Sequence, residues 1–295
     1  MQLARWCSIV AAARGEVSGS AFFSNLQLLL SRTAVPRLQS GPVPLLSGCI
    51  TQMVMWGLGS LNSSLVHIRY QLGLALLLRD LLKAGLPATG GLEAYDPVFS
   101  ALDMAVLGEC GFQVTPANPC GCHVAACPTL FYLPHCELEL TERLLAANVT
   151  AGTLGNVVIL GNSFSLYCER WELTHHGGAT SGACGGGGSL PAARQSSQGS
   201  QVESYGSQQQ RQQQHGVPGN VEAAGLDRGI STGTDGQQGA SGEGLLYDLC
   251  QCGAVDEQRV AECGFPVASA FNDMALHVFL ADWQARLARR RPLGW

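Results

Sequence analysis

The sequence predicts an α/β protein with a mostly parallel sheet, and two stretches of the chain predict it most directly. In residues 51–82, a short apolar run at 53–56 is followed by a Gly-Leu-Gly turn at 57–59 and a long apolar helix. The run at 157–160 (VVIL) contains no polar residue, as is typical of parallel strands buried on both faces. Because strands and helices of these lengths alternate, we expect a Rossmann-like three-layer sandwich with helices on both faces of the sheet.

The other elements are predicted from apolar periodicity and turn residues. In chain order we expect helices at 16–33, 65–82, 101–110, 137–147 and 281–291, and strands at 53–56, 92–95, 112–114, 128–133, 157–160 and 274–280. The last strand is expected to run antiparallel, because mostly parallel sheets accept an antiparallel edge strand and the long connection before it can return the chain in either direction.

The domain organisation predicted is one domain with an insertion. Residues 177–244 are mostly Gly, Ser and Gln, with the tract QQQRQQQ at 208–214. Such a segment buries too little apolar surface to offset its ordering entropy, so we expect it to be disordered, and a tolerated surface insertion is favoured over an interaction tail. The predicted boundaries are an N-terminal extension at 1–15, the domain at 16–170 and 245–280, the disordered insertion at 171–244, and a C-terminal tail at 281–295.

Composition excludes some partners and suggests a compartment. Charged residues make up 13% of the chain and the net charge is −5, so there is no basic surface for direct nucleic-acid binding. No apolar run reaches the ~18 residues of a membrane span. The twelve cysteines stand mostly in apolar contexts, and no secretory signal is recognised, which favours reduced thiols in the cytoplasm, the nucleus or both. Residues 1–15 contain Arg5 and Arg14 but no acidic residue, so an organelle transit peptide stays open as an alternative.

Polar side chains at the ends of strands form the candidate site. Parallel strands end at one edge of the sheet, where open α/β sheets bind ligands, and an antiparallel last strand brings the residues before it to the same edge, toward Asp96 and His135. The candidate ligand-binding residues are Gly57, Gly59, Ser60, Asp96, His135, Asn162, Ser163, Asn272 and Asp273. Two acids clustered there suit a cation, a ribose or a basic partner side chain better than free phosphate.

Each part of this site has a plainer alternative. The turn after the first strand offers backbone N–H groups that can hold an anion. Asn62, however, stands where the dinucleotide fingerprint has its third glycine, so a simple strand-to-helix turn is supported as well as a ligand-binding turn. Asp96 lies beyond the usual offset of about 20 residues for a ribose-binding acid. For His135, the role of a general base and that of a cap on the following helix are supported about equally. The sequence identifies no catalytic residue and no cofactor.

A cysteine-bearing loop is the weak candidate for a metal site. Its possible ligands are Cys120, Cys122, His123 and Cys127. Their spacing matches no usual pair of zinc-ligand pairs, so we predict no metal there.

Several short motifs occur together in this chain. They are GLGSL at 57–61, RYQLGLALLL at 69–78, YDPVFS at 95–100, TLFYLPHCELELTERLLAAN at 129–148, NVVILGNSF at 156–164 and AFNDMALHVF at 270–279. In this order they resemble the family named for plant mutants with reduced sensitivity to red light, over roughly residues 16–170 and 262–280. The resemblance implies a regulatory role: light signalling and circadian rhythm in plant relatives, control of haem synthesis in animal relatives, and a place in cytoplasm and nucleus. It implies no established catalytic mechanism.

Three molecular hypotheses follow. The leading one is a regulatory domain that binds a small-molecule ligand or a protein partner. The second is a nucleotide- or S-adenosylmethionine-dependent enzyme, methyltransferase-like, that uses the turn at 57–59 and Asp96. The third is a scaffold whose pocket edge is vestigial. Of the three, we favour a function without catalysis over the enzyme hypothesis.

Overall fold

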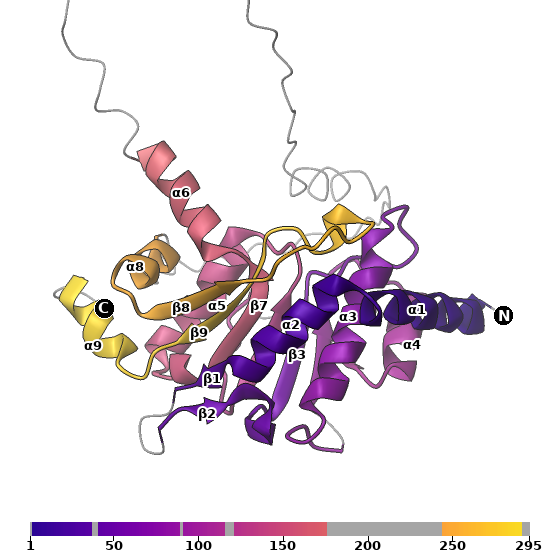
Figure 1. Cartoon of the computed structure of the whole chain (residues 1–295), viewed down its shortest axis with the longest axis horizontal. Helices are drawn as coiled ribbons and strands as arrows, with labels where there is room; N and C mark the ends of the chain where they lie inside the picture. Colours follow the sequence, from indigo (N-terminus) through magenta and orange to yellow (C-terminus); the bar gives the residue numbers. More distant parts are fainter. Residues whose placement is uncertain (1, 37–40, 89–90, 116–120, 176–243, 291–295) are drawn as a thin grey trace, which may run out of the picture. The chain divides into compact units, whose positions relative to one another are not determined.

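The computed structural model describes residues 2–36, 41–88, 91–115, 121–175 and 244–290 (Figure 1). Most of the predicted insertion, residues 176–243, lies outside these ranges. Within them, no helix combines the length and the apolar character that a membrane crossing requires.

A seven-stranded sheet forms the centre of the fold, in the order β5-β4-β3-β6-β7-β9-β8. Its strands are β3 (Gln52–Trp56), β4 (Leu92–Tyr95), β5 (Gln113–Val114), β6 (Thr129–Leu133), β7 (Val157–Asn162), β8 (Val255–Arg259) and β9 (Met274–Phe279). Strands β5, β4, β3, β6 and β7 are parallel, whereas β9 runs antiparallel to β7 and to β8. The predicted α/β class, mostly parallel sheet and antiparallel final strand are therefore confirmed.

Eight helices in the described ranges accompany the sheet. They are α1 (Gln2–Ser18), α2 (Ala21–Arg32), α3 (His67–Leu82), α4 (Ala101–Glu109), α5 (Leu138–Thr150), α6 (Phe164–His175), α8 (Leu245–Gln251) and α9 (Trp283–Arg290). A small hairpin joins β1 (Ala34–Val35) to β2 (Val43–Pro44), and short helical turns occupy Leu45–Cys49, Leu154–Asn156 and Ala268–Ala270.

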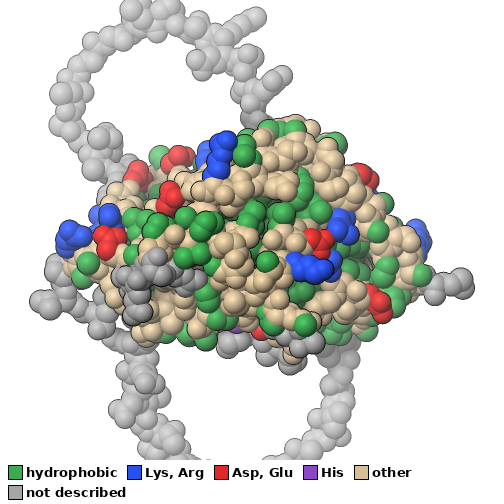
Figure 2. All heavy atoms as spheres, turned by 60° about the horizontal axis from the view of Figure 1, so that its bottom comes forward, with side chains coloured by type: hydrophobic (Ala, Val, Ile, Leu, Met, Phe, Trp, Pro, Cys, Tyr) green, Lys and Arg blue, Asp and Glu red, His purple; other side chains and the backbone are tan. Residues whose placement is uncertain are grey.

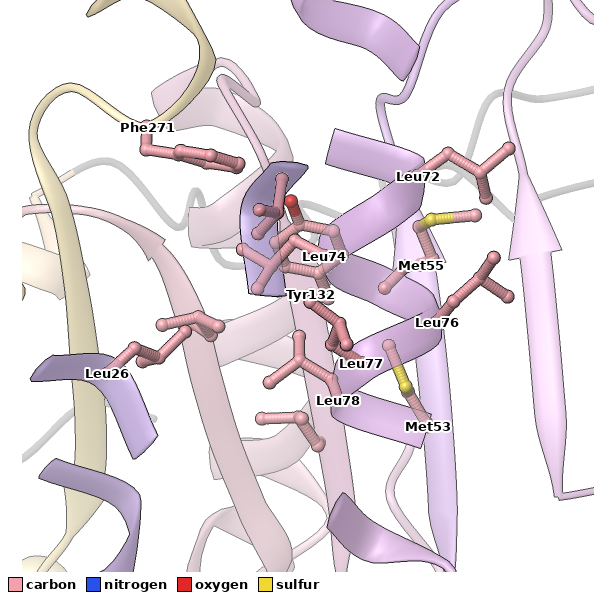
Figure 3. Close-up of a cluster of buried hydrophobic side chains, with 14 of the residues drawn as sticks. Leu26, Met53, Met55, Leu72, Leu74, Leu76, Leu77, Leu78, Tyr132 and Phe271 are labelled. Atoms are coloured by element: carbon pink, nitrogen blue, oxygen red, sulfur yellow. The ribbon is translucent and has the colours of Figure 1, made fainter. Parts of the chain in front are cut away.

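The sheet separates two hydrophobic cores, because successive side chains of a strand point to opposite faces. Met53 and Met55 of β3 pack with α1 to α4, whereas Val54 and Trp56 pack with α5, α6, α8 and α9. Figure 3 shows the first core, where leucines of α3 lie against the two methionines and against Tyr132 of β6. Helices thus cover both faces, in three layers.

The N-terminal part differs from the prediction of one helix at 16–33. Two helices occupy residues 2–32, separated at Gly19-Ser20, where the Ser20 side chain caps α2 by accepting from the N–H of Phe23. The predicted boundary after residue 15 falls inside α1. That helix packs closely on α3, since a Cβ on Gly73 would lie 2.9 Å from the backbone nitrogen of Arg14. Helix α1 therefore contributes Val10, Ala13 and Val17 to the packed core.

Two further differences concern the C-terminal half. Helix α6 continues to residue 175, past the predicted start of the insertion at 171. Strand β8 is the edge strand, so β9 is an interior strand rather than the edge strand that was predicted. The sequence VDEQR of β8 was missed because its exposed side chains carry no apolar alternation.

Charged side chains are sparse on the surface. On the face shown in Figure 2, the charged side chains lie in a few small groups, and apolar and neutral atoms separate these groups. This distribution matches a chain with 13% charged residues.

Candidate functional site

The carboxyl edge of the parallel strands brings most of the predicted site residues together. The antiparallel pairing sets Asn162 opposite Met274, and the carbonyl of Asp273 accepts a 2.7 Å hydrogen bond from the N–H of Ser163. The loops after β3, β4, β6 and β7 and the segment before β9 therefore meet at this edge. A parallel last strand would have placed Asp273 at the opposite edge.

The glycine turn after β3 is tightly built. Gly57 and Gly59 have φ of +71° and +81°, in the left-handed region that favours glycine. A Cβ on Gly57 would lie 2.5 Å from the sulfur of Cys136, so only glycine fits against the β6 loop. The N–H of Gly59 donates to Asp96 Oδ2 at 2.8 Å, and the N–H of Val98 donates to Oδ1 at 3.0 Å. Burial raises the pKa of Asp96, although these two hydrogen bonds oppose the shift.

A second carboxylate, missed from the sequence, completes this turn. Asp103 on α4 is fully buried, and it accepts hydrogen bonds from Ser60 Oγ at 2.8 Å and from the N–H of Leu61 at 2.9 Å. It also forms a capping box with Ser100. The Ser-x-x-Asp spacing at 100–103 is the signal that could have found it. The N–H groups of Gly59 and Leu61 already donate to these carboxylates, so an anion at this turn would have to compete with Asp96 and Asp103 for them.

His135 links the β6 loop to the segment before β9. Its φ is +55°, and its Nε2 lies 2.7 Å from the carbonyl oxygen of Ser269. The ring, which has an exposed edge, contacts that of His67 with centroids 6.0 Å apart. Burial is the main cause that lowers the pKa of both imidazoles, and Asp273 opposes the shift at His135. The N-cap of α5 is Glu137, so the alternative of His135 as a helix cap is wrong.

Asn162 belongs to a hydrogen-bonded group around Cys136. Its Nδ2 donates to the carbonyl of Cys136 at 3.1 Å and to the hydroxyl of Tyr167 at 2.8 Å, and that hydroxyl donates to the same carbonyl at 3.0 Å. Burial raises the pKa of Tyr167 to about 12 and also raises the pKa of Cys136. Tyr167 therefore acts as a neutral hydrogen-bonding group at neutral pH.

Ser163 belongs to a polar network that includes Glu257 of β8 and the buried His277 of β9. Ser163 Oγ donates to Glu257 Oε1 at 2.5 Å, and the N–H and Oγ of Ser165 donate to Oε2 at 2.8 Å. Glu257 thus stabilises the N-terminus of α6. His277 stacks on Phe164 at 3.7 Å and accepts from its N–H at 3.4 Å, while its Nδ1 lies 3.3 Å from the carbonyl of Ile159. Burial lowers the pKa of His277 to about 4, so this ring is neutral.

The segment before β9 contains the candidate residues Asn272 and Asp273. Asp273 has φ of +58°, and its carboxylate lies 3.8 Å from the guanidinium of Arg259. Within the described residues, the buried Oδ1 of Asn272 has no hydrogen-bond partner. Burial lowers the pKa of His135 and the charge of Asp273 opposes this shift, whereas the carboxylate of Asp96 accepts from the N–H of Gly59 in the glycine turn.

The cysteine loop contains no complete metal site in the part of the chain described. Cys120 lies outside that part, Cys122 is exposed and Cys127 is half-buried. His123 packs on Trp56 and Phe131, with ring centroids 6.0 and 5.3 Å away. Among the described residues, no three His, Cys, Asp or Glu side chains are grouped to hold a metal ion.

Two surface cavities are lined by residues other than the predicted ones, although Arg259, which lines the second, lies 3.8 Å from the carboxylate of Asp273. One, of about 380 Å³, is lined by Gln251, Cys252 and three arginines of α9; the other, of about 270 Å³, lies between α2 and the segment 258–261. Neither contains a predicted site residue. The candidate site is therefore an edge of converging loops that differs from both of these cavities.

Comparisons with known proteins give the relationship of this chain. The protein SENSITIVITY TO RED LIGHT REDUCED 1 of Arabidopsis thaliana is 38% identical over 120 residues, which are 40% of this chain and 42% of that protein. An SRR1-like protein of Mus musculus is 39% identical over 118 residues, 40% of this chain and 46% of that protein. The chain thus matches less than half the length of these relatives.

No solved structure matches the chain. The SRR1 domain model, however, matches residues 36–278, a range that runs from the β1–β2 connection to the last interior strand and contains every predicted site residue. On this match over most of its length, the chain belongs to the SRR1 domain family.

Proposed function

We propose that this protein is a regulatory protein that binds a small-molecule ligand or a protein partner at the carboxyl edge of its sheet. The observation that carries the proposal is that the motifs GLGSL, YDPVFS, LPHCE, GNSF and FND, far apart in sequence, meet at that edge. Loops at this edge of a doubly wound sheet are the usual place of ligand recognition. Exposed apolar side chains on the same loops, Leu65, Val66 and Val98, add a surface suited to contact with another molecule.

The charges of the edge favour an uncharged or positively charged ligand. The N–H groups of Gly59 and Leu61 already donate to Asp96 and Asp103, so a phosphate lacks its donors there. The lowered pKa values of His67 and His135 leave both rings neutral at neutral pH. Asp273, with 39% of its side chain exposed, is an accessible carboxylate whose ion-pair partner, Arg259, is itself exposed. A basic peptide segment or a cationic small molecule therefore suits this edge better than a nucleotide phosphate.

The process in which the protein acts is proposed from its family. A relative in Arabidopsis thaliana is named for reduced sensitivity to red light. We extend this to a role in light signalling, circadian rhythm or the regulation of haem and tetrapyrrole synthesis, exercised in the cytoplasm, the nucleus or both. Binding at the carboxyl edge is the molecular event through which such a role would operate.

A thermal-shift screen tests the proposal. The compounds are S-adenosylmethionine, a nicotinamide cofactor, ATP and haem, together with a library of basic peptides. A ligand that binds only the folded state stabilises it by about 2.7 kcal/mol at 100 times its dissociation constant. The variant Asp273→Asn should abolish the shift given by a cationic binder, because asparagine tolerates the left-handed conformation of this position but removes the charge. Asp256→Asn, the same change at an exposed position of β8, is the matched control.

A binder whose shift is unchanged in Asp273→Asn would refute the cationic preference. If no compound or peptide shifts the melting temperature, the proposal of a binding edge fails and the scaffold hypothesis replaces it.

An S-adenosylmethionine-dependent enzyme is the second candidate, and the strand order favours it. Counted from β3, the parallel strands have the order 3-2-1-4-5 of doubly wound nucleotide-binding sheets. An antiparallel strand inserted before the last edge strand is an arrangement typical of methyltransferases, so this argument is one of fold-level analogy. The test is production of S-adenosylhomocysteine from S-adenosylmethionine with cell extract as acceptor, compared with Asp96→Asn.

A further inference from the structure

Helices α6 and α8 pack against each other. The ring of Trp171 on α6 stacks on that of Tyr247 on α8, with centroids 6.1 Å apart, and a Cβ on Gly244 would lie 3.0 Å from Trp171. Glu172 accepts hydrogen bonds from the hydroxyl of Tyr247 at 3.2 Å and from Nε2 of Gln251 at 3.3 Å. These contacts fix which residues of the two helices face each other.

Each of the two helices carries a cysteine about one helical turn from its stacked ring. Cys168 comes three residues before Trp171, and Cys250 comes three residues after Tyr247. Residues three apart share a helix face, so each cysteine lies on the face of its helix that carries the stacked ring. Both thiols are free, both belong to the same hydrophobic core, and each is close enough to the other to be the main cause of the other's pKa shift.

This contact makes the two thiols unequal. The hydrogen bond from Cys250 is the main cause that lowers the pKa of Cys168, while the same contact raises the pKa of Cys250. The thiolate is the nucleophile in thiol chemistry, so Cys168 is the attacking sulfur of the pair and Cys250 is its resolving partner. Cys168 is 8% exposed, which admits a small oxidant more readily than a large disulfide reagent.

We propose that Cys168 and Cys250 are a redox-modification site that forms an intramolecular disulfide when the protein meets hydrogen peroxide. The Cys168 thiolate attacks one peroxide oxygen, the O–O bond breaks, and the released hydroxide takes a proton, which leaves a sulfenic acid and one water. The Cys250 thiol then attacks the Cys168 sulfur, the S–O bond breaks and a second water leaves. Two thiols are oxidised, and one peroxide is reduced to two waters.

The disulfide has a defined place in the chain. Helix α6 ends at residue 175 and α8 begins at residue 245, so the bond closes a covalent loop around the segment between them. The proposal does not depend on ligand binding at the carboxyl edge. Each can fail without the other.

The test uses the full chain, reduced and then treated with hydrogen peroxide. The expected result is an intact mass lower by two hydrogens, with peptides containing Cys168 and Cys250 joined until a reductant is added. Cys168→Ser and Cys250→Ser should each abolish the cross-link. Cys252→Ser is the matched control and should retain it, because the Cys252 thiol donates to the carbonyl of Leu249.

Circular dichroism establishes that each variant is folded, and Cys168→Ala replaces the serine variant if the hydroxyl prevents folding. A cross-link that persists without Cys168 or Cys250, or a product that gains oxygen atoms without forming a disulfide, would overturn the proposal.

Discussion

Replacing Asp103 with asparagine tests whether this carboxylate organises the glycine turn. Asp103 is fully buried and accepts from four groups: Ser60 Oγ, the N–H of Leu61, and both the N–H and Oγ of Ser100. Oδ1 receives the Leu61 bond, and Oδ2 receives the other three. The side chain thereby joins the loop after β3 to the first turn of α4.

The structure allows the cost of this change to be worked out. In Asp103→Asn the amide oxygen keeps the Leu61 bond, and the two serine hydroxyls can turn to accept from the new amide nitrogen. The N–H of Ser100, now 2.7 Å from Oδ2, instead faces another donor. A hydrogen bond to a charged group contributes about 1.5–3 kcal/mol, and a buried donor left without a partner costs about 1–3 kcal/mol. We therefore expect the free energy of unfolding to fall by about 2–4 kcal/mol.

Urea denaturation followed by circular dichroism measures this difference at neutral pH. Glu109→Gln makes the same change at an exposed position of the same helix. Its free energy of unfolding should stay within about 0.5 kcal/mol of that of the parent protein. If Asp103→Asn unfolds at the same urea concentration as Glu109→Gln, Asp103 does not stabilise the turn through its hydrogen bond with the N–H of Leu61.

Three further changes have defined outcomes. Gly59→Val should lower the free energy of unfolding by at least about 1–3 kcal/mol in urea denaturation, because φ is +81° and a β-branched residue is strained there. His277→Gln should flatten the pH dependence of stability. Folded His277 stays neutral down to pH about 4, whereas the unfolded chain binds a proton near 6.5, so stability is lost as pH falls between these values, by up to about 3 kcal/mol. Replacing residues 178–241 with a short Gly-Ser linker should leave the melting temperature nearly unchanged, because their composition offers little apolar surface to bury.

Each of these outcomes has a control or a contrary result. Gly155→Ala, where a Cβ meets open space and φ is not positive, should be tolerated, and a Gly59→Val protein that melts like it would show that the turn is not strained. An unchanged pH slope in His277→Gln would assign the titration to other histidines. Loss of folded protein after the linker replacement would show that the segment packs.

The sequence could predict the parallel strands, because strands buried on both faces leave continuous apolar runs such as 53–56 and 157–160. It also predicted that residues after these strands would meet Asp273 at one edge, since strand direction fixes the edge at which each loop lies. It did not predict α1, whose buried residues are only Val10, Ala13 and Val17. That helix is positioned by the close approach to Gly73, which joins residues far apart in the chain.

The chemistry of the edge was decided by the tertiary structure. The sequence suggests that Asp96 is a free carboxylate at a strand end, but in the fold the glycine turn approaches it and the N–H of Gly59 donates to it. Glu257 lies in a strand with no apolar signature, and only the pairing of β8 with β9 brings it to Ser163 and His277. The sequence by itself therefore determined where the buried parallel strands lie in the chain, because apolar periodicity is a local property. The tertiary structure decided which groups stay free there, because hydrogen bonds between distant segments depend on the packing of the whole sheet.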